Sequence, residues 1–133
     1  MSVSAYKRTM REAESPRAIE RQIFSRITSS LSTYAESYDA ADSREARLRI
    51  LSGGLQVSLS ENIRLWSVLK TDLQREDNAL PQALRAQLIS LALFVERQTR
   101  GILRGEAKVA GLISLNRSII DGLAGIAPEA SAA

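Results

Sequence analysis

The sequence predicts an all-α protein, an antiparallel bundle of about four helices. Leu, Ala, Arg, Gln and Glu dominate the chain, and these residues form helices well, whereas runs of β-branched residues are few. Apolar residues recur at steps of three and four, which places them on one face of a helix. The connections between these segments are short, which favours antiparallel packing of consecutive helices. A length of 133 residues fits a single domain.

The first long helix is expected to begin at Ser15-Pro16. Serine can accept a hydrogen bond from a free backbone N–H, and proline suits the first helical position because it has no N–H to lose. The segment 36–42 is expected to end this helix and connect it to the next. The apolar stripe of the helix consists of Ile19, Ile23, Phe24, Ile27, Leu31, Tyr34 and Tyr38.

A second helix is expected to begin at Asp42 or Ser43, where Asp42 and Glu45 have the spacing of a capping box. Gly53-Gly54 interrupts the pattern, and each glycine costs about 1 kcal/mol relative to alanine inside a helix. This pair predicts a continuous but bent helix, or a close contact between two helices. Asn62 occupies a position where the stripe would place an apolar residue. The stripe consists of Leu48, Leu51, Leu55, Leu59, Trp66, Leu69 and Leu73.

The polar segment 74–80 predicts a turn, after which Pro81 opens a third helix. Gly101 and Gly105 are expected to mark the end of this helix. Its apolar residues cover more than one face, which predicts a position near the centre of the bundle. A fourth helix is expected from about Val109 to Leu123, again with a broad apolar face. The small residues of 127–133 predict a disordered tail.

The composition excludes most catalytic chemistry. The chain has no cysteine and no histidine, so it lacks thiolate nucleophiles, zinc–sulfur sites and the commonest general base. Gly53-Gly54 is not followed by the Lys-Ser/Thr of a phosphate-binding loop. We therefore expect a protein that is not an enzyme and has no cofactor or metal site.

Two further observations concern the location of the protein in the cell. The densest apolar run, Leu88 to Val95, is eight residues long, whereas a membrane span needs about 20. The first residues lack the apolar core of a signal peptide. We therefore expect a cytoplasmic protein without a membrane segment.

The net charge of +3 is carried by the N-terminal segment. Residues 1–26 contain six basic and three acidic side chains, so the remainder of the chain is neutral. A solvated helix end is the favoured interpretation, and contact with RNA or an acidic partner is the alternative.

Three polar or aromatic residues on apolar stripes are candidates for a structural role in the core or for contact with a partner. Trp66 is the only tryptophan, and we expect it to lie in the core. The alternative is that it anchors a partner protein. Asn62 and Asn116 each interrupt an apolar stripe, and a buried amide must be hydrogen-bonded. Asn116 is expected to act as an internal clamp, with the turn at 78–81 as its candidate partner.

The ordered set of these features resembles the FlaF family of flagellar biosynthesis regulators of alphaproteobacteria. The resemblance covers nearly the whole chain, although no single motif in it is chemically diagnostic. It is carried by Ser4-Ala5-Tyr6, Ser15-Pro16-Arg17, Ile19-Glu20, Gly54-Leu55, Asn62, Trp66, Asn78-Ala79-Leu80-Pro81, Leu84 to Leu91, Phe94-Val95, Leu112-Ile113, Asn116 and Gly122-Leu123.

The resemblance implies a FlaF-like helical domain over residues 1–126, followed by the tail. It also implies a cytoplasmic secretion chaperone that binds flagellin and controls flagellin synthesis with a companion regulator, FlbT. The alternative is a post-transcriptional regulator that contacts flagellin mRNA or FlbT directly.

A chaperone of this kind would hold a flagellin helix in an apolar groove. Candidate groove residues are Trp66, Leu69, Leu73, Leu84, Leu88 and Leu91, or else the stripe of the first helix from Ile19 to Tyr34. Asn62, Pro81 and Asn116 are expected to have structural roles.

Overall fold

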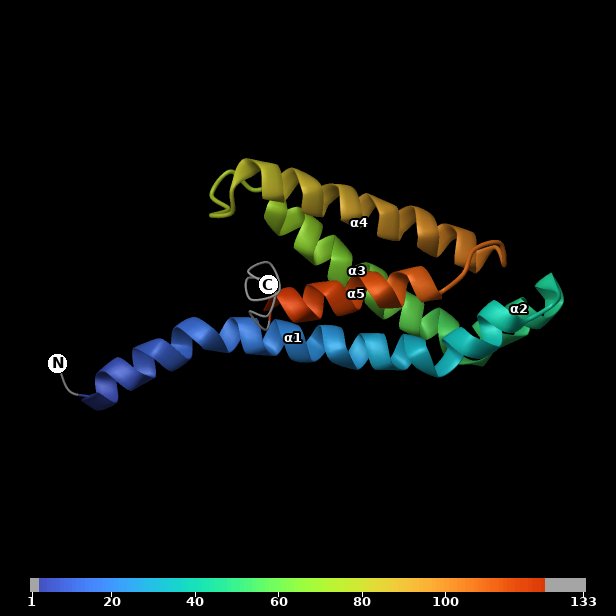
Figure 1. Cartoon of the computed structure of the whole chain (residues 1–133), viewed down its shortest axis with the longest axis horizontal. Coiled ribbons are helices and arrows are strands. Elements are labelled where there is room, and N and C mark those ends of the chain that lie inside the picture. Colours follow the sequence, from blue (N-terminus) through green and yellow to red (C-terminus); the bar gives the residue numbers. More distant parts are fainter. Residues whose placement is uncertain (1–2, 124–133) are drawn as a thin grey trace, which may run out of the picture.

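The computed structural model describes the backbone of residues 3–123 and the side chains from Glu20 to Gly122. Every regular element in this part of the chain is helical, so the predicted all-α bundle is confirmed. The tail predicted for residues 127–133 lies outside the described residues. The elements are α1 (Val3–Ala40), α2 (Arg44–Ile50), the π-helical turn η1 (Leu51–Leu55), α3 (Gln56–Leu73), α4 (Gln82–Leu103) and α5 (Ala110–Leu123) (Figure 1).

The helices pack as two principal pairs, α1 on α5 and α3 on α4, and further contacts between α1 and α3 join the pairs. The short helix α5 lies between α1 and α4 (Figure 1). The prediction that the third helix occupies the centre is wrong, because α4 packs mainly against α3 at one side of the bundle (Figure 1). As a result, α4 leaves Leu84, Leu93 and Leu103 exposed to solvent.

One core cluster joins all four long helices. Phe24 and Trp66 meet edge to face, with ring centroids 5.8 Å apart and an interplanar angle of 86°. This geometry contributes about 0.5–1.5 kcal/mol beyond the burial of the rings. The largest contributions from each helix are Phe24, Ile27, Leu31 and Tyr38 of α1; Leu59 and Trp66 of α3; Ala92, Val95 and Ile102 of α4; Leu112 and Ile113 of α5.

A hydrogen-bonded polar group lies inside this core. The indole Nε1 of Trp66 donates to Oδ1 of Asn116 at 2.9 Å, and Nδ2 of Asn116 donates to Oδ1 of Asn62 at 2.8 Å. All three side chains are at most 1% exposed. Because an indole N–H can only donate, it fixes the orientation of the Asn116 amide and, through it, that of Asn62. Asn116 is thus an internal clamp, but it joins α5 to α3 and does not reach the turn at 78–81.

The start of α1 and the cap of α2 differ from the sequence prediction, whereas the predicted start of the second helix at Ser43 agrees with the structure. Helix α1 begins at Val3 and continues through Pro16, so Ser15-Pro16 does not start it. A proline removes one intrahelical hydrogen bond, and a long helix can tolerate this loss. Helix α2 is capped by Ser43, whose side chain accepts from the N–H of Ala46, so Asp42 and Glu45 do not form a capping box. The side chains up to position 19, including most of the basic N-terminal segment, lie outside those described.

The structure contains the bend predicted at Gly53-Gly54. It also contains the predicted alternative, a close contact between two helices. Gly54 has a φ of +145°, a conformation that side chains with a Cβ rarely adopt. A Cβ at this position would lie 2.1 Å from the hydroxyl oxygen of Tyr34 on α1. The sequence therefore needs glycine at 54 both for the turn in the backbone and for the packing of α1 on η1.

The connection between α4 and α5 is held by α1 and α2. Helix α4 ends in a Schellman motif, in which Glu106 N–H bonds the carbonyl of Gly101 and Gly105 adopts φ +75°. Gly105 is therefore the stop signal, whereas Gly101 lies inside α4, where its missing side chain admits Ala107. The carboxylate of Asp39 accepts from the N–H groups of Val109 and Ala110 and caps the start of α5.

Tyr38, next to Asp39, donates its buried hydroxyl to the carbonyl of Ile102 at 2.5 Å. Burial raises the pKa of the Tyr38 phenol, and the neighbouring Arg47 only partly offsets this effect. The phenol therefore keeps its proton and its hydrogen bond at neutral pH. Adjacent residues of α1 thus hold the end of α4 and the start of α5.

Replacing Asn116 with alanine tests the core clamp. The substitution leaves the Trp66 N–H and the Asn62 carbonyl without partners in a dry core, and it opens a small cavity. We expect the free energy of unfolding to fall by about 2–4 kcal/mol. Urea denaturation measures this loss, with Ser114→Ala on the exposed side of α5 as a control that stays within about 0.5 kcal/mol. A shift no larger than that of the control would contradict a clamp.

Alanine at the two adjacent glycines should have opposite effects. Gly54→Ala meets both the unfavourable φ and the ring of Tyr34, so we expect a loss of at least about 2 kcal/mol. A Cβ at Gly53 would have no neighbour within 4 Å, so Gly53→Ala should be neutral or should stabilise the protein by up to about 1 kcal/mol. Thermal unfolding of the two variants compares them directly, and equal effects would disprove the assigned geometry.

Candidate functional site

An open groove of about 640 Å³ lies where the end of α3, the connection 74–81, the start of α4 and the end of α5 meet. Leu73 forms its floor and is almost fully buried. Half-buried leucines and isoleucine form the sides, and Leu80 and Leu84 stand exposed at the rim. The apolar lining residues are Leu69, Leu73, Ala79, Leu80, Leu84, Leu88 and Ile119.

The structure brings four of the six candidate groove residues together. Leu69 and Leu73 lie one turn apart on α3, and Leu84 and Leu88 lie one turn apart on α4. Trp66 is 1% exposed and belongs to the core, so a partner cannot reach it in this conformation. Leu91 is half-buried and packs against the core instead of lining the groove.

The alternative candidate surface, the stripe of α1, is less accessible. Phe24, Ile27 and Leu31 are buried in the core, and Ile23 and Tyr34 pack against it. The side chain of Ile19 lies outside those described. The described part of this stripe therefore belongs to the interior of the bundle.

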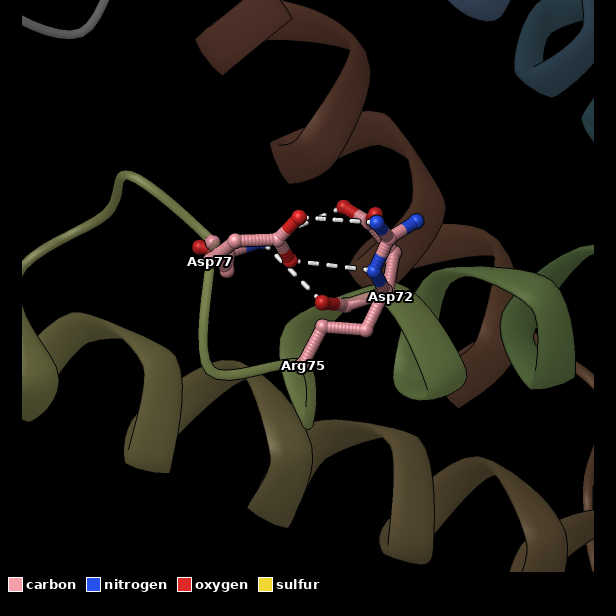
Figure 2. A network of polar contacts seen from close by, with 4 residues as sticks. Asp72, Arg75 and Asp77 are labelled. Atoms are coloured by element: carbon pink, nitrogen blue, oxygen red, sulfur yellow. Dashed lines mark hydrogen bonds and ion pairs between the residues drawn. The ribbon is translucent and has the colours of Figure 1, made fainter.

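The connection between α3 and α4 is a polar turn, and Figure 2 shows Asp72, Arg75 and Asp77 where α3 ends. Arg75 forms a two-pronged ion pair with Asp77, with Nε–Oδ1 at 3.0 Å and Nη2–Oδ2 at 2.8 Å. Asn78 donates its amide to the backbone carbonyl and the carboxylate of Asp72, and its Oδ1 accepts from the N–H of Leu80. The last bond is an Asx turn, which fixes the backbone that presents Leu80 at the rim.

Further bonds hold the two helices on either side of this turn. Nε of Arg85 on α4 donates to the carbonyl of Leu73 at 3.1 Å, at the last turn of α3. Nζ of Lys70 donates to Glu96 at 2.5 Å in a partly buried ion pair between α3 and α4. Pro81 takes the N-cap position of α4, and its carbonyl accepts from the N–H of Arg85 at 2.9 Å. Pro81 therefore lies at the start of α4 as expected, one residue before the first helical residue.

Sequence reasoning missed several residues of the groove. Ile119 lies three positions after Asn116, and Leu80 directly precedes Pro81, but neither position signals an exposed surface by itself. Glu20 of α1 also reaches the groove, which no local pattern could indicate because it comes from a distant part of the chain. Only the packing of α1 across α5 brings this residue to the rim.

The groove presents apolar side chains and surface charges to a possible ligand. Among the described side chains, residues 20–122, no group of three or more His, Cys, Asp or Glu residues is placed to hold a metal ion. The helices in the same part of the chain lack the combined length and hydropathy that crossing a bilayer requires.

The fold and the groove define a small all-α bundle protein with an open apolar surface at one end. Residues 2–123 match the model of the family described as flagellar protein FlaF. The chain belongs to this family, and the family resemblance inferred from the sequence is confirmed. Searches of curated proteins and of solved structures find no significant match.

Replacing Asn78 with alanine tests whether its side chain holds the turn. The change removes the acceptor for the Leu80 N–H and both bonds to Asp72, so the turn should open more often. We expect the amide of Leu80 to exchange about tenfold faster with solvent, with a stability loss of about 1 kcal/mol. Hydrogen exchange followed by NMR measures both, and Gln74→Ala, an exposed neighbour, serves as the control. Unchanged exchange at Leu80 would show that the turn does not need Asn78.

Proposed function

We propose that this protein binds flagellin in the cytoplasm as a secretion chaperone and controls flagellin synthesis together with FlbT. The observation that carries the proposal is the open apolar groove in a member of a flagellar protein family. Binding sites are commonly concave and lined mostly by apolar side chains with a few polar groups, and this groove has that form.

The groove suits a helical segment. Leu69 and Leu73 face it from α3, and Leu84 and Leu88 face it from α4, so two short apolar ridges border a channel with Leu73 at its floor. An amphipathic helix binds such a channel through side chains at positions i, i+3, i+4 and i+7. The polar turn at 74–80 closes one end and is already fixed by its own hydrogen bonds, so little ordering is needed when a partner binds.

Binding of this kind explains how a chaperone can act without chemistry. A helix that contributes to flagellin assembly cannot contact a second subunit while its apolar stripe is in the groove. Burying about four apolar side chains contributes roughly 6–12 kcal/mol before the cost of association is subtracted. Because association costs at least about 4 kcal/mol, these contacts give an affinity that is micromolar at the tightest, which allows the subunit to be released.

The control of flagellin synthesis with FlbT is the second part of the proposal. It is supported by membership of the FlaF family and is tested separately from the groove. A pull-down from cells with this protein as bait should recover both flagellin and FlbT. Recovery of flagellin without FlbT would remove the second part and leave the first.

A pair of charge substitutions on one helix tests the groove. Leu84, at the rim, and Leu93, outside the groove, are both on α4 and are 40% and 43% exposed. Leu84→Asp places a charge where an apolar partner side chain should lie, so we expect flagellin affinity to fall at least about tenfold. Leu93→Asp should leave affinity unchanged.

Size-exclusion chromatography with purified flagellin at micromolar concentration gives the readout, and circular dichroism checks that both variants keep their helicity. If wild-type protein and flagellin elute separately, the chaperone proposal is wrong. If both aspartate variants bind equally well, flagellin binds elsewhere.

A further inference from the structure

The rim of the groove carries an excess of negative charge. Glu20, Asp72 and Asp77 line the groove, and among the side chains that the structure describes (residues 20–122) Arg75 is the only basic one in its lining. The guanidinium of Arg75 is paired with the carboxylate of Asp77 through two hydrogen bonds, so these two charges offset each other. Glu20 and Asp72 remain, one contributed by α1 and the other by α3.

The nearby basic groups on α3 and α4 do not neutralise these two carboxylates. Arg85 directs its Nε to the carbonyl of Leu73, where its charge faces the negative end of the α3 dipole. Lys70 is paired with Glu96. Asp72 accepts a hydrogen bond from the amide of Asn78, which is neutral.

From this juxtaposition we infer that the groove accepts an amphipathic helix whose apolar stripe is bordered by lysine or arginine. The apolar side chains of that helix lie on Leu69, Leu84 and Leu88, above the buried Leu73, and its basic side chains reach Glu20 and Asp72. Complementary charge of this kind sets orientation and speeds association, and it disfavours helices with acidic borders. The inference deepens the proposed function by naming the chemistry of the bound segment, and its assignment to a flagellin helix rests on that function.

Two synthetic peptides of about 14 residues, or four helical turns, provide the test. Both carry leucine at positions i, i+3, i+4 and i+7, and they differ only in having lysine or glutamate beside the leucines. Fluorescence anisotropy measures their binding to the full-length protein. We expect the lysine peptide to bind about tenfold more tightly at low ionic strength. This preference should nearly disappear at about 1 M salt, where charges more than about 3 Å apart are screened.

A matched pair of double variants assigns the preference to the rim. Glu20→Gln with Asp72→Asn removes both free charges, and asparagine at 72 keeps an oxygen for the amide of Asn78. This variant should lose most of the preference for lysine. The control, Glu36→Gln with Glu45→Gln, removes two exposed carboxylates that do not line the groove and should retain the preference.

Equal binding of the two peptides, preference for the glutamate peptide, or failure of both to bind would overturn the inference. So would an equal loss of preference in the control variant.

The chaperone proposal has a separate outcome, because it depends on flagellin itself. If flagellin binds through Leu84 while the peptides show no charge preference, the inference fails and the proposed function stands. If the lysine peptide binds and flagellin does not, the proposed function fails and the charge preference of the groove stands.

Discussion

The hydrogen bond from Trp66 to Asn116 is the contact on which the placement of the groove depends. It joins α3 to α5 inside a dry core, and the donor-only indole allows just one orientation of the Asn116 amide. An apolar pair at these positions would tolerate sliding by a fraction of a turn, whereas a 2.9 Å hydrogen bond does not. Leu69 follows Trp66 by three residues, and Ile119 follows Asn116 by three residues, so the same bond brings these two side chains to the groove.

The polar core is costly, which argues that it is kept for specificity. Nδ2 of Asn62 and Oγ1 of Thr28 are buried and have no hydrogen-bond partner among the described residues. Each such atom costs about 1–3 kcal/mol. An apolar core would avoid this cost but would specify the relative positions of α1, α3 and α5 less strictly. A surface that must match a partner helix depends on that register, and buried polar groups are known to fix register in helical assemblies.

The sequence was sufficient for the class of fold and most of the helices, because stripes such as Phe24, Ile27 and Leu31 are local signals. It also identified four groove leucines, since positions four apart on neighbouring helices face the same space. It did not indicate that α4 would pack mainly against α3 at one side of the bundle, because the apolar face of α4 is broad and only tertiary packing decides where the helix lies. The partner of Asn116 was misjudged for the same reason. A local sequence pattern shows that an amide is buried, but it does not show which helix lies opposite that amide. Glu20 likewise reaches the rim only because α1 packs near residues that are distant in the sequence.

Affinity and selectivity have separate origins in this groove. In the proposed binding mode, the leucines provide apolar area, which attracts any helix with a suitable stripe, and the carboxylates of Glu20 and Asp72 distinguish among such helices. The proposed chaperone would benefit from this separation, because its client must be recognised among many amphipathic segments but must not be held so tightly that export is prevented. Charges at a solvated rim act mainly on the association rate, so the preference for one helix can rise without slowing its release. The rigid turn at 74–80 supports the same balance, because a site that is already ordered can bind quickly without needing a larger apolar contact to offset the entropy of ordering.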